Sequence, residues 1–293
     1  MSGKARSTLL VLCLLWLSAV RAWAQSAGDP VSEPALRGRR DILYFLDFND
    51  HARAEDWFRT RPGYAWTARR ENVLAGAGAL EIRHTRGTHL PMEIHPEIAP
   101  SDCVYVRWYR RWEKDYDFTQ HKMPGVYAQA GRTSGAGVRP TGRDKFSCKL
   151  FVDFQRFPAL YSYHPDQKGP YGDHLKQNVG EPVRVEPERW YCFEMMIQAN
   201  SAPNRDGELK MWIDGELKAH HLNLRFRDTN TLKINLFTYS AYVGGTWVSK
   251  RDQRLWDDQI VVARNYIGPL ADRPTGKERP KRFQPPVGYE RSE

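Results

Sequence analysis

The chain alternates in two neighbouring runs, FSCKLFVDF at residues 146–154 and LYSYH at residues 160–164. Alternation with a period of two is typical of a β-strand. Residues 156–159, RFPA, lie between the runs and include a proline, so they predict the turn that joins the two strands. The two runs therefore predict a β-hairpin.

Four polar side chains fall two residues apart on this hairpin, Ser147 with Lys149 and Tyr161 with Tyr163. Residues two apart on a strand point to the same face of the sheet. If the two faces coincide, a hydroxyl, an ammonium and two phenols meet on one surface, where they could hold an acidic sugar and move a proton. The alternative is an ordinary half-exposed sheet face, because tyrosine is a favoured strand residue. The hairpin alone favours this second interpretation.

Strand patterns recur along the rest of the chain. Further strands are predicted at residues 41–48, 79–83, 103–112, 190–198, 232–239 and 257–264, with two more around the tight turn at Asp214 and Gly215. No long apolar pattern with a period of 3.6 residues and no persuasive internal repeat is present. Many strands separated by turn signals predict an all-β sandwich or jelly roll.

The first 24 residues have the features of a signal peptide. Lys4 and Arg6 precede an apolar run at residues 9–17, and AWA at residues 22–24 is a cleavage site of the A-x-A kind. The apolar run is too short for a transmembrane helix, and no later run could span a bilayer. We therefore expect a secreted or periplasmic protein. Its expected parts are a signal peptide at residues 1–24, a linker at 25–40, one domain at 41–270 and a disordered, charged tail at 271–293.

The charge of the chain restricts its partners. The formal net charge is +9, and removal of the three basic residues of the signal peptide lowers it to +6. A basic secreted protein attracts anionic partners, which include nucleic acid, anionic membrane surfaces and acidic polysaccharides. Charge alone does not choose among these three.

Cysteines and histidines do not predict a metal site. Three cysteines remain after cleavage, Cys103, Cys148 and Cys192, and no C-x-x-C motif suggests a zinc ribbon. One disulfide with one buried thiol and three buried thiols are both compatible with their spacing. The histidine pairs, His220 with His221 and His89 with His95, match no established metal-ligand spacing. We expect neither a metal nor a cofactor.

Several short motifs occur in an order that resembles one family. They are KMPG at residues 122–125, FSCKL at 146–150 and YSY at 161–163, followed by Trp190, Asp206-Gly207, WIDG at 212–215, Arg225 and Gly244-Gly245. Together they resemble polysaccharide lyase family 14, which includes alginate and glucuronan lyases, over about residues 41–268. The resemblance implies a concanavalin A-like β-jelly roll and β-elimination of uronate polysaccharides.

The resemblance also implies the site residues, which are Lys122, Ser147, Lys149, Tyr161 and Tyr163. The chain departs from the family pattern at three places. Lys149 stands where the family usually has arginine, so the bidentate fork of a guanidinium is lost. Methionine replaces leucine in the first motif, and residues 126–128, VYA, replace a glycine-rich continuation.

β-Elimination at a 4-linked uronate needs three functions. The C6 carboxylate must be neutralised, a base must remove the C5 proton, and an acid must protonate the leaving oxygen on C4. Lys122 is the implied base; because a free lysine has a pKa of about 10.4, it must be desolvated or lie near other cations. Tyr161 or Tyr163 would be the acid, with the other holding the sugar, while Lys149 and Ser147 bind the carboxylate. The plain alternative for Lys122 is a solvated lysine before a Pro-Gly turn.

The sequence therefore predicts a secreted lyase that acts on an acidic polysaccharide, with no nucleic-acid partner and no membrane span. Trp247, beside two glycines, is the predicted platform for a sugar ring. The alternatives are a non-catalytic carbohydrate-binding jelly roll for anionic glycans, and an extracellular adhesion or structural protein whose basic face meets such glycans. Formation of the unsaturated uronate product would separate the lyase from both.

Overall fold

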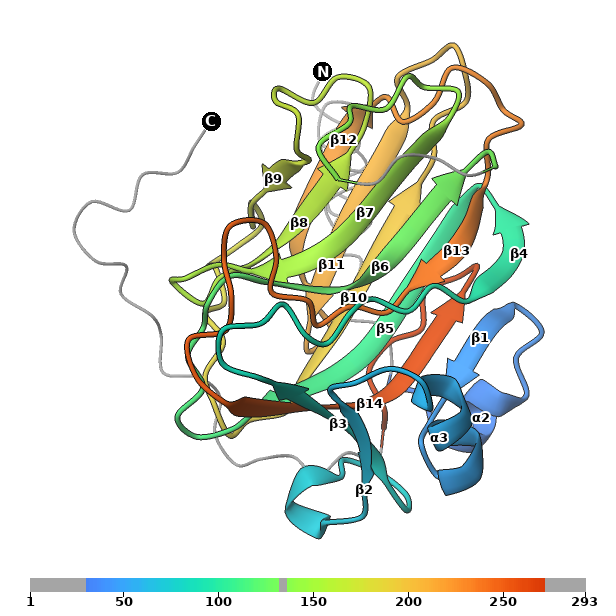
Figure 1. Ribbon diagram of the computed structural model, residues 1–293. Helices are drawn as coiled ribbons and strands as arrows, with labels where there is room; N and C mark the ends of the chain where they lie inside the picture. The colour runs from blue at the N-terminus through green and yellow to red at the C-terminus, as the bar shows by residue number, and fades with distance from the viewer. Residues whose placement is uncertain (1–29, 132–135, 272–293) are drawn as a thin grey trace, which may run out of the picture.

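Two antiparallel sheets pack against each other in the computed structural model, which describes residues 30–131 and 136–271 (Figure 1). The larger sheet consists of β1 (Ile42–Leu46), β2 (Tyr64–Thr67), β3 (Ala79–His84), β5 (Cys103–Trp112), β10 (Tyr191–Gln198), β11 (Gly207–Ile213), β12 (Glu216–Leu224) and β14 (Gln253–Ala263). The smaller sheet consists of β4 (Glu97–Ser101), β6 (His121–Gln129), β7 (Lys145–Val152), β8 (Pro158–Tyr163), β9 (Asp173–Leu175) and β13 (Ile234–Thr238). The predicted all-β sandwich is confirmed.

The smaller sheet packs one face against the larger sheet and leaves its other face outside the sandwich. The order of its strands is β4-β13-β6-β7-β8-β9, and the order is β12-β11-β10-β5-β14-β3-β2 in the larger sheet, where β1 also pairs with β14. Cys148, Leu150 and Val152 of β7 point into the core between the sheets. The alternate residues of β7 therefore lie on the outer face. The first and last predicted strands, β1 and β14, are neighbours in one sheet.

The central strands of the larger sheet, β5, β10 and β14, are buried on both faces. Val106, Trp108 and Trp112 of β5 belong to the main core between the sheets. Tyr109 of the same strand belongs to a second apolar cluster on the opposite face. Burial of each large apolar side chain stabilises the fold by about 1.5–3 kcal/mol. The sandwich therefore has a central core and a second apolar layer outside the larger sheet.

Part of the segment predicted as a linker belongs to that second layer. Residues Glu33–Arg37 form the short helix α2, capped by the Ser32 side chain, and Leu36 is fully buried in the second cluster. A backbone bridge also joins Val31 to Leu270. One leucine in a polar segment carries too weak a pattern to predict this packing. The predicted signal peptide and all but the first residue of the predicted tail lie outside the described residues.

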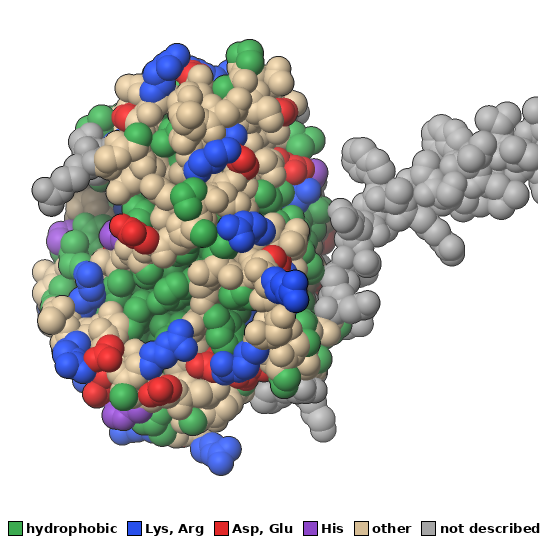
Figure 2. Space-filling view, turned by 90° about the vertical axis from the view of Figure 1, so that its right-hand side faces the viewer, with side chains coloured by type: hydrophobic (Ala, Val, Ile, Leu, Met, Phe, Trp, Pro, Cys, Tyr) green, Lys and Arg blue, Asp and Glu red, His purple; other side chains and the backbone are tan. Residues whose placement is uncertain are grey.

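The connection between β1 and β2 contains the helix α3 (His51–Phe58), and a single turn, η1 (Arg70–Asn72), follows β2. On the side of the molecule where β4, β1 and α3 lie, hydrophobic side chains gather in the middle of the face, among charged ones (Figure 2). Leu43, Tyr44 and Trp57 from β1 and α3 are partly buried against the main core. They help to close the sandwich between the two sheets. No helix in the described residues is long and apolar enough to cross a membrane.

The predicted hairpin is formed by β7 and β8, but its turn lies earlier than predicted. Pro158 already pairs with Val152 as the first residue of β8, a position that tolerates proline. The Asp153 side chain accepts hydrogen bonds from the backbone N–H groups of Gln155 and Phe157, and thereby closes the turn. An aspartate whose side chain accepts from the backbone N–H two residues later is a turn signal in its own right.

The cysteines match the second of the two predicted arrangements only in part, because Cys103 is half-buried. Cys103, Cys148 and Cys192 are all free thiols, with Cys148 and Cys192 buried.

Candidate active site

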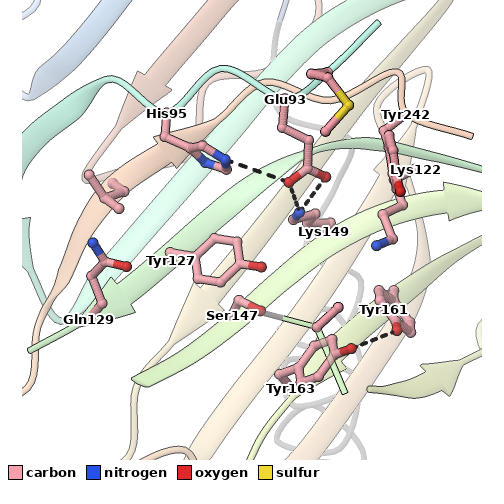
Figure 3. A pocket seen from close by; sticks show the side chains of 13 residues that line it. Glu93, His95, Lys122, Tyr127, Gln129, Ser147, Lys149, Tyr161, Tyr163 and Tyr242 are labelled. Atoms are coloured by element: carbon pink, nitrogen blue, oxygen red, sulfur yellow. Dashed lines mark hydrogen bonds and ion pairs between the residues drawn. The ribbon is translucent and has the colours of Figure 1, made fainter. Parts of the chain in front are cut away.

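The outer face of the smaller sheet carries a cleft of about 400 Å³. All five residues implied by the family resemblance line it: Lys122, Ser147, Lys149, Tyr161 and Tyr163 (Figure 3). The other lining residues are Met92, Glu93, His95, Tyr127, Gln129, Ala136, Leu236 and Tyr242.

The register of three adjacent strands brings the hairpin residues together. Ser147 of β7 is paired with Tyr163 of β8 on one side and with Tyr127 of β6 on the other. Lys149 is paired with Tyr161. The two same-face pairs predicted from the sequence therefore do share one face, and β6 adds a third row to them.

Lys122 reaches the cleft because the register of β6 is irregular. The pairing with β7 shifts between Lys122 and Gly125. A Cβ atom at Gly125 would lie 2.2 Å from the Cys148 carbonyl oxygen, so only glycine allows β6 and β7 to approach this closely. The Lys122 Nζ then lies 5.4 Å from the ring centre of Tyr161 and 5.3 Å from that of Tyr242. Gly125 of the first motif is therefore required for the close approach of the two strands.

The surroundings of Lys122 favour an uncharged amine. Burial, followed by the nearby Lys149 ammonium, lowers the pKa of Lys122 to about 8, while Glu93 acts in the opposite direction. A base with a pKa near the working pH combines the free form with a useful proton affinity. The geometry therefore suits Lys122 to proton abstraction.

Lys149 is already ion-paired within the cleft. Its Nζ donates to Glu93 Oε1 at 2.5 Å and to Oε2 at 2.6 Å, and the Ser240 hydroxyl donates to Oε1 at 2.9 Å. Burial opposes the charge of both partners, but their mutual attraction lowers the pKa of Glu93 and raises that of Lys149. The ammonium predicted to neutralise the substrate carboxylate is thus bound to a carboxylate of the protein.

The two tyrosines of β8 are joined to each other. The Tyr161 hydroxyl donates to the Tyr163 oxygen at 3.2 Å, and the backbone N–H of Gly137 donates to the same oxygen at 3.4 Å. Burial, followed by the hydrogen bond to Tyr163, raises the pKa of Tyr161. Since Tyr163 accepts both bonds, its own hydrogen is free to point elsewhere.

The family model for polysaccharide lyase 14 matches residues 75–260, which is more than half of the chain. The chain belongs to polysaccharide lyase family 14. The match includes all five implied site residues and the segment that carries Tyr242. No curated protein matches the chain.

Solved structures of alginate lyases share the fold of this family 14 chain. Alginate lyase Aly36B has 18% sequence identity and a TM-score of 0.62, covering 78% of this chain and 98% of its own. The PL-14 alginate lyase of Aplysia kurodai has 15% identity and a TM-score of 0.61, with 76% and 99% covered. Alginate lyase vAL-1 from Chlorella virus has 15% identity and a TM-score of 0.61, with 76% and 100% covered. The predicted β-jelly roll is therefore confirmed.

Trp247 does not line the cleft of the family 14 domain. It lies in the loop before β14, where its side chain is 45% exposed and packs edge-on against Phe154, with 5.0 Å between ring centres. Phe154 comes from the turn between β7 and β8 and is also 45% exposed. Two loops far apart in sequence thus place two exposed aromatic rings side by side.

Several cleft residues were not found from the sequence. Tyr127 and Gln129 lie two apart on β6, so the same-face rule would have found them once this strand was recognised. Glu93 and Tyr242 come from irregular segments that carry no periodic signal. Within residues 30–131 and 136–271, no group of three or more His, Cys, Asp or Glu residues could hold a metal ion.

Proposed function

We propose that the protein is an exported lyase that cleaves a uronate-containing polysaccharide by β-elimination in this cleft. The position of Lys122 supports this most directly. Its amine is desolvated, has a pKa of about 8 and lies beside the ring of Tyr161, in a chain of a polysaccharide lyase family. A lysine in open solvent would have neither the lowered pKa nor the ring beside it. The relatives named above are alginate lyases, which supports a uronate polymer as the substrate.

The proposed reaction breaks two bonds of the sugar and forms one double bond. The free amine of Lys122 takes the proton from C5, and the electrons of that C–H bond form the C4–C5 double bond. The bond from C4 to the leaving oxygen breaks, and the Tyr163 hydroxyl gives that oxygen its proton. Tyr161, still protonated, can then return a proton to Tyr163 through the hydrogen bond that joins them. The Lys122 ammonium supplies the proton that restores the starting state.

The test is a screen of uronate polymers, including alginate and glucuronan, with the ultraviolet absorbance of the unsaturated uronate as the readout. A rise in absorbance with time supports the lyase. Binding of a polymer without any rise would instead support a non-catalytic carbohydrate-binding protein.

The proposed reaction assigns different roles to the two tyrosines, since Tyr163 donates the proton and Tyr161 only supports it. Tyr163→Phe removes the hydroxyl that donates to the leaving oxygen, so kcat is expected to fall by roughly 10²-fold or more. Tyr161→Phe keeps that donor and removes only its partner, so its effect on kcat should be at least several-fold smaller. Steady-state rates of both variants on one substrate measure this. Equal losses in kcat, or a larger loss in Tyr161→Phe, would reverse the assignment.

Trp247 remains the predicted sugar platform, now placed outside the cleft. An aromatic ring that stacks on a distal sugar contributes about 0.5–1.5 kcal/mol, so Trp247→Ala should raise KM for a long polymer roughly 2- to 10-fold. Oligosaccharides that fill only the cleft should be unaffected. Leu222→Ala is the matched control, because Leu222 is 55% exposed on β12 of the other sheet. Equal KM changes for long and short substrates would contradict the platform.

A further inference from the structure

A second aromatic ring, that of Tyr242, faces the amine of Lys122. The Lys122 Nζ lies over this ring at 5.3 Å from its centre, and over the Tyr161 ring at 5.4 Å. Figure 3 shows the amine between the two side chains. The face of an aromatic ring carries partial negative charge and attracts an ammonium within about 6 Å of the ring centre. Both rings therefore stabilise the charged form of Lys122.

The segment that carries Tyr242 is fixed at four successive backbone carbonyl groups, those of residues 240–243. Each accepts a hydrogen bond from a different donor. In chain order the donors are the Arg110 guanidinium at 3.2 Å, the His84 ring at 2.8 Å, the Lys122 backbone N–H at 2.9 Å and the His89 ring at 2.9 Å. Because Lys122 itself supplies one of these bonds, the position of the ring relative to the base is fixed by the backbone of both residues.

Gly244 leaves the space that the Tyr242 ring occupies. A Cβ atom at Gly244 would lie 1.8 Å from Cε1 of Tyr242, so any other residue there would push the ring aside. The ring of His89 packs against that of Tyr242, with 5.8 Å between ring centres. The ring therefore keeps its place beside the amine through its neighbours as well as through its backbone.

Among the described residues, the other charged and titratable groups near Lys122 come from three elements. Burial and the Lys149 ammonium of β7 favour the free amine, while the carboxylate of Glu93, before β4, favours the ammonium. His174 of β9 also lies near Lys122, and burial lowers the pKa of this histidine, so it is uncharged near pH 8. Together they leave the pKa of Lys122 at about 8, where a change beside the amine can be measured.

We infer that Tyr242 is a positioning residue of the proposed reaction: its ring orients the Lys122 amine and stabilises the ammonium that forms from it. The amine is uncharged before it takes the C5 proton and charged afterwards. The attraction of the ring therefore grows as the proton is transferred, and an interaction that is stronger in the transition state than in the ground state raises kcat. The catalytic part of this role rests on the proposed function, whereas the contact between ring and amine does not.

The experiment measures the pKa of Lys122 in the full chain, from the pH dependence of its acetylation by acetic anhydride, followed by mass spectrometry of the peptide. Tyr242→Leu keeps an apolar side chain but removes the ring face, so the pKa of Lys122 should fall by about 0.5–1. Tyr242→Phe keeps the face and should leave that pKa within about 0.3 of its value. Lys250, whose side chain is 58% exposed, reacts in the same samples and should titrate alike in all variants.

On a cleaved uronate polymer, Tyr242→Leu should lower the plateau of kcat/KM about 3- to 10-fold and move its rise to lower pH. Tyr242→Phe should keep both the plateau and the pH of the rise. A slower Tyr242→Leu with an unchanged Lys122 pKa, or an equal loss in Tyr242→Phe, would overturn the inference. If Tyr242→Leu fails to fold, Tyr242→Met gives the same test with a more adaptable side chain.

The two measurements separate this inference from the proposed function. A lowered Lys122 pKa in Tyr242→Leu, with no uronate polymer cleaved by the unaltered chain, would reject the lyase and support the contact between ring and amine. Cleavage by the unaltered chain, with the same Lys122 pKa in Tyr242→Leu, would reject only the role of Tyr242.

Discussion

Lys122→Ala is expected to lower kcat on a cleaved uronate polymer by at least about 10²-fold, the usual size of a positioned general base. The fold should be retained, because the side chain lies in the cleft, and the backbone N–H of Lys122 keeps its 2.9 Å hydrogen bond to the Tyr242 carbonyl. Initial rates from the product absorbance, together with a thermal unfolding curve, measure both parts. Lys250→Ala, at a 58% exposed lysine, is the control and should keep full activity.

The pH dependence gives the same prediction a second readout. Only the free amine acts as base, so kcat/KM should rise with pH and level off above the Lys122 pKa of about 8. Residual activity in Lys122→Ala should lack this rise. Full activity of the variant on a proven substrate would remove the proposed mechanism and leave the fold unaffected.

The site residues of the hairpin could be predicted because the sequence patterns that indicate them are local. Alternation in residues 146–154 and 160–164 predicts the hairpin, and the same-face rule by itself groups Ser147 with Lys149 and Tyr161 with Tyr163. Antiparallel pairing then aligns the two pairs on one face. Lys122 has no such local signal, and only the order of family motifs connects it with the hairpin.

The ion pair of Lys149 could not be predicted from the sequence. As a lysine in place of the family arginine, Lys149 was expected to neutralise the substrate carboxylate. Its partner Glu93 lies 56 residues away in an irregular segment before β4, and Ser240 lies in another after β13. Contacts between irregular segments leave no period in the sequence, so neither the pair nor its support could be foreseen.

A second ion pair, Arg110 with Asp257, is completely buried between the sheets. A hydrogen bond connects it with Ser240, which in turn binds Glu93 of the cleft. Both side chains have no exposed surface. The Tyr239 hydroxyl also donates to Asp257, at 2.5 Å, and Arg110 donates to the carbonyl of Ser240, the residue that holds Glu93. Loss of one member of such a pair leaves the other charge without compensation in the core.

Asp257→Asn keeps the shape of the side chain and removes its charge, so it is expected to lower the free energy of unfolding by about 3–5 kcal/mol. Urea unfolding followed by tryptophan fluorescence measures the change. Asp56→Asn is the control: Asp56 pairs with Arg59 on the surface of α3, where both side chains are about two-thirds exposed, and its loss should change stability by less than about 1 kcal/mol. The double variant Arg110→Met with Asp257→Leu should regain part of the lost stability, because it removes both buried charges together. If Asp257→Asn unfolds at the same urea concentration as the unaltered chain, the buried guanidinium does not depend on this carboxylate, and the support proposed for Ser240 and Glu93 fails with it.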